Sequence, residues 1–408
     1  MSSRRSHLRQ ATVAATTVAT LALAVGCSSS GSHDNGGATD GSSAKGAITI
    51  ESWNSLANPA IALPETKTAM QAAIKAINAG GGISGHQVKL NFCDSNFDPN
   101  TEVACAREAV SKKVAAVVGA ASYFPNTAAV LEAGKIPLVG ARGADPTDFT
   151  SPISFPMVAG TFGWANGMAT LAKDLGLARV SIVSSASPTS SQQTELAKAR
   201  LGELGVQVVK VVSAPTGAAD QTATAAAATD GVDGILADAP PNDTLKVLQA
   251  LKQSGFGGSF ISPSPTTPPN SLKALGTIPF KQYAVSVTVP PSQTSDPTIA
   301  KFDAEMDAID PTAQKSETAL TFWTAMKLFA AVCSKLDTID ASSVTKAMNS
   351  LQEPVQLGST APYAVAGVTS PVKAAPRLFN PMVMYLQIKD GVPTPIDGKF
   401  VNPFPSAG

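Results

Sequence analysis

The chain has 408 residues, of which 44% are hydrophobic and 15% are charged, so it is long enough for two domains and too apolar to be disordered. Lys and Arg together number 30, as do Asp and Glu, and this balance lacks the basic surface that binding to nucleic acid requires. These values predict a soluble globular protein with no nucleic-acid partner.

The N-terminus has the layout of a secretory signal peptide. Three arginines precede an apolar run at residues 11–25, which is shorter than the roughly twenty residues of a membrane-spanning helix. Residues 23–27, LAVGC, resemble the lipobox of bacterial lipoproteins, in which the cysteine is lipidated. We therefore expect a lipoprotein signal peptide at residues 1–26 and a lipid on Cys27. That lipid would hold the protein at the outer face of the cytoplasmic membrane, in the cell envelope.

A flexible Ser/Gly-rich tether is expected at residues 27–46, because this stretch shows no apolar periodicity. Three further cysteines follow it. Cys93 ends an extended run and Cys105 lies about two turns into the next helical stretch, so the two could meet, and export makes a disulfide possible. We predict a Cys93–Cys105 bond and expect Cys333, within an apolar helical run, to be a buried free thiol.

From residue 47 onward, short β-rich runs alternate with longer helical ones, which is typical of βαβ units and parallel sheets. The first series of strands and helices comprises residues 48–50, 65–79, 88–93, 99–112, 114–119, 126–133 and 136–139. After a break, the second series comprises residues 180–183, 192–204, 206–212, 221–229, 234–236, 244–253 and 260–261. Two parallel sheets in series indicate two Rossmann-like lobes.

Three extended segments are expected to pass between these lobes and to form a hinge. The first covers residues 154–160, the second covers residues 283–289, and the third precedes a final strand at residues 382–388. Helices are expected at residues 297–306 and 316–336. This organisation predicts lobe one at residues 47–158 and 286–378, and lobe two at residues 159–285 and 379–408.

Several motifs give the chain a family resemblance. Residues 73–88 read AIKAINAGGGISGHQV, and VVG at 117–119, IPLV at 136–139 and YLQIKDG at 385–391 follow in order. Together they resemble the type I solute-binding proteins of branched-chain amino acid uptake systems, over residues 47–400. The resemblance implies a periplasmic-binding-protein type I fold and a monomeric receptor that hands a small-molecule solute to the permease subunits of an ABC importer.

Candidate ligand contacts lie in the loops after the strands, because ligands of open parallel sheets bind beyond the carboxyl ends of the strands. In lobe one these candidates are Trp53, Ser55, Ser122, Tyr123, Arg142 and Gly143. In lobe two they are Thr189, Asp238 and Ser264. Trp53 and Tyr123 are expected to form an aromatic wall, and Arg142 to be available for a carboxylate.

The amino-acid clamp of the family is incomplete in this sequence. The Ala-Thr pair expected in the second lobe-one loop reads Gly143-Ala144, and the tyrosine and acid expected in lobe two are replaced. Asp238 is the one acid left near the lobe-two mouth. We therefore expect a compact, partly apolar acid, amide or alcohol instead of a standard α-amino acid, with branched-chain amino acids as the alternative.

Catalytic machinery, a metal site and a cofactor are not expected. The sequence contains no GxSxG nucleophile motif, and beyond the N-terminal segments its one histidine is His86, without cysteine or carboxylate at ligand spacing. Two alternatives to an importer receptor stay open at this point. One is a lipoprotein that feeds a sensor without transport, and the other is an amide- or ester-cleaving enzyme.

Overall fold

The computed structural model describes residues 45–405, which belong to one compact unit. The expected signal peptide, Cys27 and the tether up to residue 44 lie outside the described residues. Within the described part of the chain, none of the helices combines the length and the apolar character that crossing a membrane requires.

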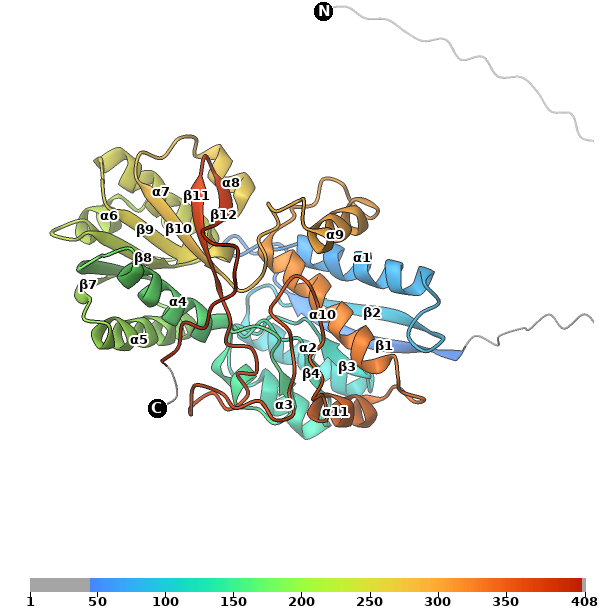
Figure 1. Cartoon of the computed structure of the whole chain (residues 1–408). Helices are drawn as coiled ribbons and strands as arrows, with labels where there is room; N and C mark the ends of the chain where they lie inside the picture. Colours follow the sequence, from blue (N-terminus) through green and yellow to red (C-terminus); the bar gives the residue numbers. More distant parts are fainter. Residues whose placement is uncertain (1–44, 406–408) are drawn as a thin grey trace, which may run out of the picture. The chain divides into compact units, whose positions relative to one another are not determined.

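Lobe one is built on a five-stranded parallel sheet with the strand order β2-β1-β3-β4-β5 (Figure 1). Its strands are β1 (Lys45–Asn54), β2 (His86–Asp94), β3 (Ala116–Val118), β4 (Leu138–Val139) and β5 (Ser154–Phe155). The first four were predicted from their apolar, β-rich runs. The fifth begins the first segment that was expected to connect the lobes.

Lobe two is built on a seven-stranded sheet with the order β12-β11-β10-β9-β8-β6-β7. Its strands are β6 (Arg179–Ser184), β7 (Gln207–Ser213), β8 (Gly234–Asp238), β9 (Ser259–Pro263), β10 (Lys281–Ser286), β11 (Met384–Lys389) and β12 (Val392–Pro395). Strands β6 to β10 are parallel, and the hairpin β11–β12 adds two antiparallel strands at the edge. The predicted α/β class with two parallel sheets is confirmed.

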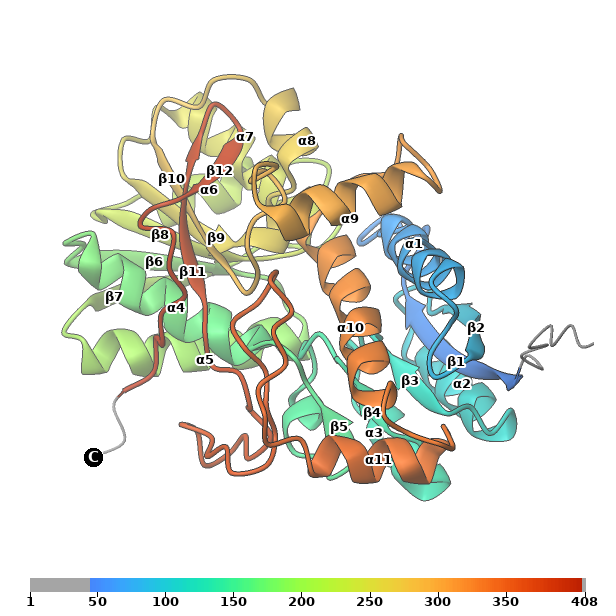
Figure 2. The same cartoon turned by 45° about the vertical axis from the view of Figure 1, so that its right-hand side comes forward.

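Helices cover both sheets. Those of lobe one are α1 (Glu65–Ala79), α2 (Pro99–Ser111), α3 (Thr127–Gly134), α9 (Pro297–Asp307), α10 (Glu317–Cys333) and α11 (Ala341–Asn349). Those of lobe two are α4 (Gly160–Asp174), α5 (Pro188–Glu203), α6 (Thr222–Ala228), α7 (Pro241–Ser254) and α8 (Pro269–Ala274). Figure 2 shows α9 and α10 beside α1, although both follow the lobe-two strands in sequence. The chain therefore returns to lobe one after β10.

Helix α4 was not predicted, because its glycines disfavour a helix in the absence of tertiary contacts. The structure shows what they allow. A Cβ atom on Gly167 would lie 2.6 Å from a methyl group of Val285, and one on Gly163 would lie 3.1 Å from a methyl group of Val383. Glycine therefore lets α4 pack closely on β10 and on the segment that leads into β11.

The three connecting segments lie close together between the sheets. The Asn380 side chain donates to the carbonyl of Met157, 3.2 Å away, which joins the first segment to the third. Val287 of the second segment and Val383 of the third both lie near Gly163 at the start of α4. Their proximity gives the two lobes a common hinge.

The predicted disulfide is confirmed, with a Cα–Cα distance of 5.8 Å between Cys93 at the end of β2 and Cys105 in α2. Cys333 is a buried free thiol, as predicted. Asp98 caps α2 by accepting the Thr101 N–H at 2.8 Å, and Pro99 occupies the first turn. The capped end and the disulfide together fix the 93–105 segment against the sheet.

Candidate functional site

A pocket of about 120 Å³ lies where the carboxyl ends of the strands of both sheets converge. Its walls come from the loops after β1 to β4 in lobe one and from the loops after β6 to β9 in lobe two. The volume is below the roughly 300–1,000 Å³ of pockets that bury drug-sized ligands. The pocket therefore suits a compact solute that touches both lobes.

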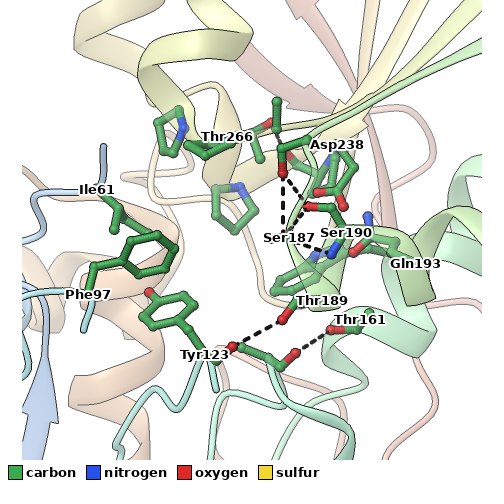
Figure 3. Close-up of a pocket in the computed structure, with 18 of the residues that line it drawn as sticks. Ile61, Phe97, Tyr123, Thr161, Ser187, Thr189, Ser190, Gln193, Asp238 and Thr266 are labelled. Atoms are coloured by element: carbon green, nitrogen blue, oxygen red, sulfur yellow. Dashed lines mark hydrogen bonds between the residues drawn. The ribbon is translucent and has the colours of Figure 1, made fainter. Parts of the chain in front are cut away.

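The lobe-one side of the pocket is mainly apolar and aromatic. The Phe97 ring meets Tyr123 edge-on at a centroid distance of 5.2 Å and lies equally close to Phe124. Ile61 and Leu63, from the loop after β1, extend this wall. Figure 3 shows Ile61, Phe97 and Tyr123 together on one side of the pocket. This side can hold the apolar body of a solute.

A buried carboxylate positions the aromatic loop. Glu102 of α2 accepts the backbone N–H groups of Tyr123, at 3.1 Å, and of Phe124, at 3.3 Å. Burial raises the pKa of Glu102 to about 8, and the two backbone hydrogen bonds act in the opposite direction. Glu102 does not line the pocket, so its role is to position the loop that does.

Arg142 follows β4 and is 8% exposed. Its guanidinium lies 5.2 Å from the centre of the Trp164 ring, and its Nη1 donates to the Tyr123 hydroxyl at 3.2 Å. That hydroxyl in turn donates to the Asn54 side chain. An arginine side chain has five N–H donors, so Arg142 keeps further donors for a ligand.

The lobe-two side of the pocket is polar. The hydroxyls of Ser185, Ser187 and Ser190 are hydrogen-bonded to one another, and Ser187 caps helix α5 (Figure 3). Asp238 ends β8, and its Oδ2 is buried without a hydrogen-bond partner among the described residues. Burial raises the pKa of Asp238 to about 6, while Ser190 and the positive charge of Arg142 act to lower it.

Two hydrogen bonds join the lobes beside the pocket. The Thr189 hydroxyl donates to the Tyr123 carbonyl at 3.3 Å, and the Asn242 side chain donates to the Pro59 carbonyl at 3.0 Å. Both bonds depend on the lobes being close, so they stabilise the closed arrangement.

Comparison with known proteins identifies the family. The family model described as "Periplasmic binding protein" matches residues 56–370. The chain belongs to the periplasmic binding protein family. No curated protein matches the sequence at a significant level.

Solved structures resemble this periplasmic binding protein in fold at low sequence identity. A possible leucine/isoleucine/valine-binding protein from Rhodopirellula baltica SH 1 superposes with a TM-score of 0.74 at 15% identity, over 87% of this chain and 97% of that one. A fatty acid ABC transporter substrate-binding protein from Thermomonospora curvata gives 0.73 at 14% identity, over 87% and 92%. An ABC transporter solute-binding protein from R. palustris in complex with 4-hydroxybenzoate gives 0.70 at 19% identity, over 87% and 95%. The fold is therefore that of type I solute-binding proteins.

Of the residues proposed from the sequence, Tyr123, Arg142, Thr189 and Asp238 line the pocket of this periplasmic binding protein. Trp53 does not. Its side chain is fully buried in a core cluster with Cys105 and other residues of lobe one. Alternation along β1 turns Trp53 toward the helix layer, so it cannot form the expected aromatic wall.

The other four candidates also lie outside the pocket lining. The Ser55 hydroxyl donates to the Ile61 carbonyl at 2.6 Å and supports the loop after β1. Ser122 accepts the Thr127 hydroxyl at 3.1 Å. Gly143 has a φ of 71°, and a Cβ atom on it would collide with the Phe149 ring. Ser264 begins a 3₁₀ turn after β9 and lines a separate small cavity. These residues support the binding loops and do not line the pocket themselves.

Several pocket residues were not predicted. Phe97 lies between the predicted strand at residues 88–93 and the predicted helix at residues 99–112, so its aromatic ring closely follows a strand end. Trp164 and Gln193 lie in the first two turns of helices α4 and α5, which follow β5 and β6. Extending the search through the first two turns of the helix after each strand would have included both residues.

A group of possible metal ligands lies away from the pocket, formed by Glu51, Cys93 and Glu108. The Cys93 sulfur is already bonded to Cys105. The Asn91 side chain donates to both carboxylates, at 2.5 and 3.2 Å. This group is accounted for by a disulfide and a hydrogen-bond network.

Proposed function

We propose that this protein is a lipid-anchored extracytoplasmic receptor that binds a compact amphipathic solute and delivers it to the permease of an ABC importer. Cys27 would carry the lipid and the tether would let the receptor reach the permease as a monomer. The lobes that close are those delimited by residues 47–158 with 286–378 and by residues 159–285 with 379–408.

The observation that carries this proposal is a pocket at the strand ends whose walls come from both lobes, next to hydrogen bonds that join them. A solute in this pocket touches both lobes only when they are close. Binding therefore favours the closed state by the difference in its affinity for the closed and open states. A permease that recognises the closed receptor would then receive a loaded one.

The pocket also limits the solute. Its apolar wall around Phe97 and its polar wall around Asp238 face each other, which favours a molecule with one apolar and one polar end. Among solved structures of the same fold, the R. palustris protein binds 4-hydroxybenzoate and a branched-chain amino acid transporter protein from Streptococcus pneumoniae binds isoleucine. For this protein we favour an acid, amide or alcohol, and branched-chain amino acids are the alternative ligands.

A thermal-shift screen of the purified protein tests binding, because a ligand that binds only the folded form raises the melting temperature. The panel contains amino acids, carboxylates, amides, polyols and aromatic acids. Uptake of the best ligand by cells that lack the protein then tests transport. Lost uptake supports the importer role, and unchanged uptake with an altered response to the solute favours a sensor.

A further inference from the structure

The pocket contains one cationic and one anionic side chain that do not pair with each other. Arg142 and Asp238 both line it, yet no ion pair within 4.0 Å joins them in the described part of the chain. Arg142 contacts Tyr123 and Trp164 instead. Two opposite charges that remain separate in one small pocket can both be paired by a solute placed between them.

Other polar atoms of the lining are also unpaired, and most of them are donors. Trp164 Nε1 and Gln193 Nε2 have no hydrogen-bond partner among residues 45–405, although the two residues are only 5% and 2% exposed. The unpaired acceptor of the lining is Asp238 Oδ2. Because buried polar groups are almost always hydrogen-bonded, these atoms indicate what the solute supplies.

The unpaired atoms fit an acceptor-rich head group with one donor. A carboxylate offers two acceptor oxygens, which suit the guanidinium of Arg142 and a neighbouring N–H donor. A single hydroxyl suits Asp238 Oδ2. An ammonium group would bring three donors, whereas Asp238 Oδ2 is the one unpaired side-chain acceptor of the lining among the described residues.

From these contacts we infer that the solute is a small hydroxycarboxylic acid, with its carboxylate on Arg142, its hydroxyl on Asp238 and its branched or aromatic body against Phe97. This inference rests on the proposed solute-binding function and specifies the ligand class of the same site. Such a site differs from an amino-acid site because the solute group that donates to Asp238 is a neutral hydroxyl instead of an ammonium.

Matched ligands test the inference by calorimetry on the purified protein. The first series is 2-hydroxy-4-methylpentanoate, 4-methylpentanoate and leucine, which share one skeleton and differ in a hydroxyl, a hydrogen or an ammonium. The second series is 4-hydroxybenzoate and benzoate. We expect the hydroxy acid of at least one series to bind about tenfold or more tightly than its deoxy partner, and more tightly than leucine.

Three variants assign the contacts. Arg142→Gln should weaken binding of the hydroxy and deoxy acids alike, by at least tenfold. Asp238→Ala should remove most of the preference for the hydroxyl, and Asp238→Asn should restore much of it, since the amide oxygen still accepts a hydrogen bond. Asp230→Ala changes an exposed aspartate of lobe two and should leave affinity unchanged. Melting temperatures without ligand report whether each variant folds.

Leucine binding that exceeds that of the hydroxy acid and collapses in Asp238→Asn would overturn the inference, because an ammonium needs the charge and a hydroxyl does not. If neither hydroxy acid binds while another solute class stabilises the protein, the inference fails and the receptor function stands. If no solute in the screen binds, both fail.

Discussion

The disulfide between Cys93 and Cys105 should contribute measurably to stability. It closes a loop with a sequence separation of 12, for which the chain-entropy model gives about 3 kcal/mol. For a folded body of about 360 residues, with an unfolding entropy of about 2.1 cal/mol/K per residue, this lowers the melting temperature by about 4 °C. The double variant Cys93→Ala/Cys105→Ala should show a loss of this size.

The same loop contains Phe97, so its release should also weaken solute binding. The Phe97 ring contacts Tyr123 and Phe124 from a segment that the disulfide and the Asp98 cap hold in place. We expect both the reduced protein and the double variant to bind the solute more weakly than the oxidised protein.

Differential scanning fluorimetry with and without a reductant measures the effect, with mass spectrometry to count free thiols. The double variant is the control, because the reductant should leave its melting temperature unchanged. The assignment of this stability to the disulfide would be refuted if full reduction left the melting temperature of the wild-type protein unchanged. It would also be refuted if the reductant lowered the melting temperature of the double variant by the same amount as that of the wild type.

Three further predictions concern the anchor, the closed state and pH. Cys27→Ala should release the protein from the membrane fraction, and full retention in high salt would place the anchor elsewhere. Asn242→Ala removes an interlobe hydrogen bond of about 1 kcal/mol, so solute binding should weaken about fivefold while the melting temperature without ligand stays unchanged. The control variant Gln249→Ala, on the same helix, should bind the solute normally. Equal affinities of the two variants would contradict this role of Asn242. Burial raises the pKa of Glu51 from 4.5 to about 7, so the folded state binds this proton more tightly. The resulting stability of about 3 kcal/mol is present below pH 4.5 and lost as pH rises through 7. Glu51→Gln should therefore raise the melting temperature relative to wild type at pH 8 more than at pH 5, and the same difference at both pH values would argue against a buried titrating carboxyl.

Local sequence signals predicted most of the regular fold. Helix α1 has the predicted bounds, and α2 begins at Pro99 as predicted and ends one residue before the predicted end. Helices α4, α8 and α11 and the edge strand β12 were missed. The glycines of α4 are explained by contacts with Val285 and Val383, which lie more than 100 residues away in the sequence.

The site was predicted in part, because the rule that ligands bind at strand ends gives positions and not side-chain directions. Tyr123, Arg142 and Asp238 point into the pocket, whereas Trp53 faces the helix layer. The alternation of side-chain directions along β1 already indicates that Trp53 faces the helices. The positioning role of Glu102 could not be predicted, since it depends on bringing α2 against a loop about 20 residues away.

The central claim is that the two lobes close on a solute, and small-angle X-ray scattering of the purified protein with and without the best ligand of the screen tests it most directly. We predict that saturation with the ligand reduces the radius of gyration in wild type and that Arg142→Gln requires a higher ligand concentration for the same change. Tight binding with an unchanged scattering curve would contradict closure, and conversion of the bound ligand into a product would contradict a receptor role.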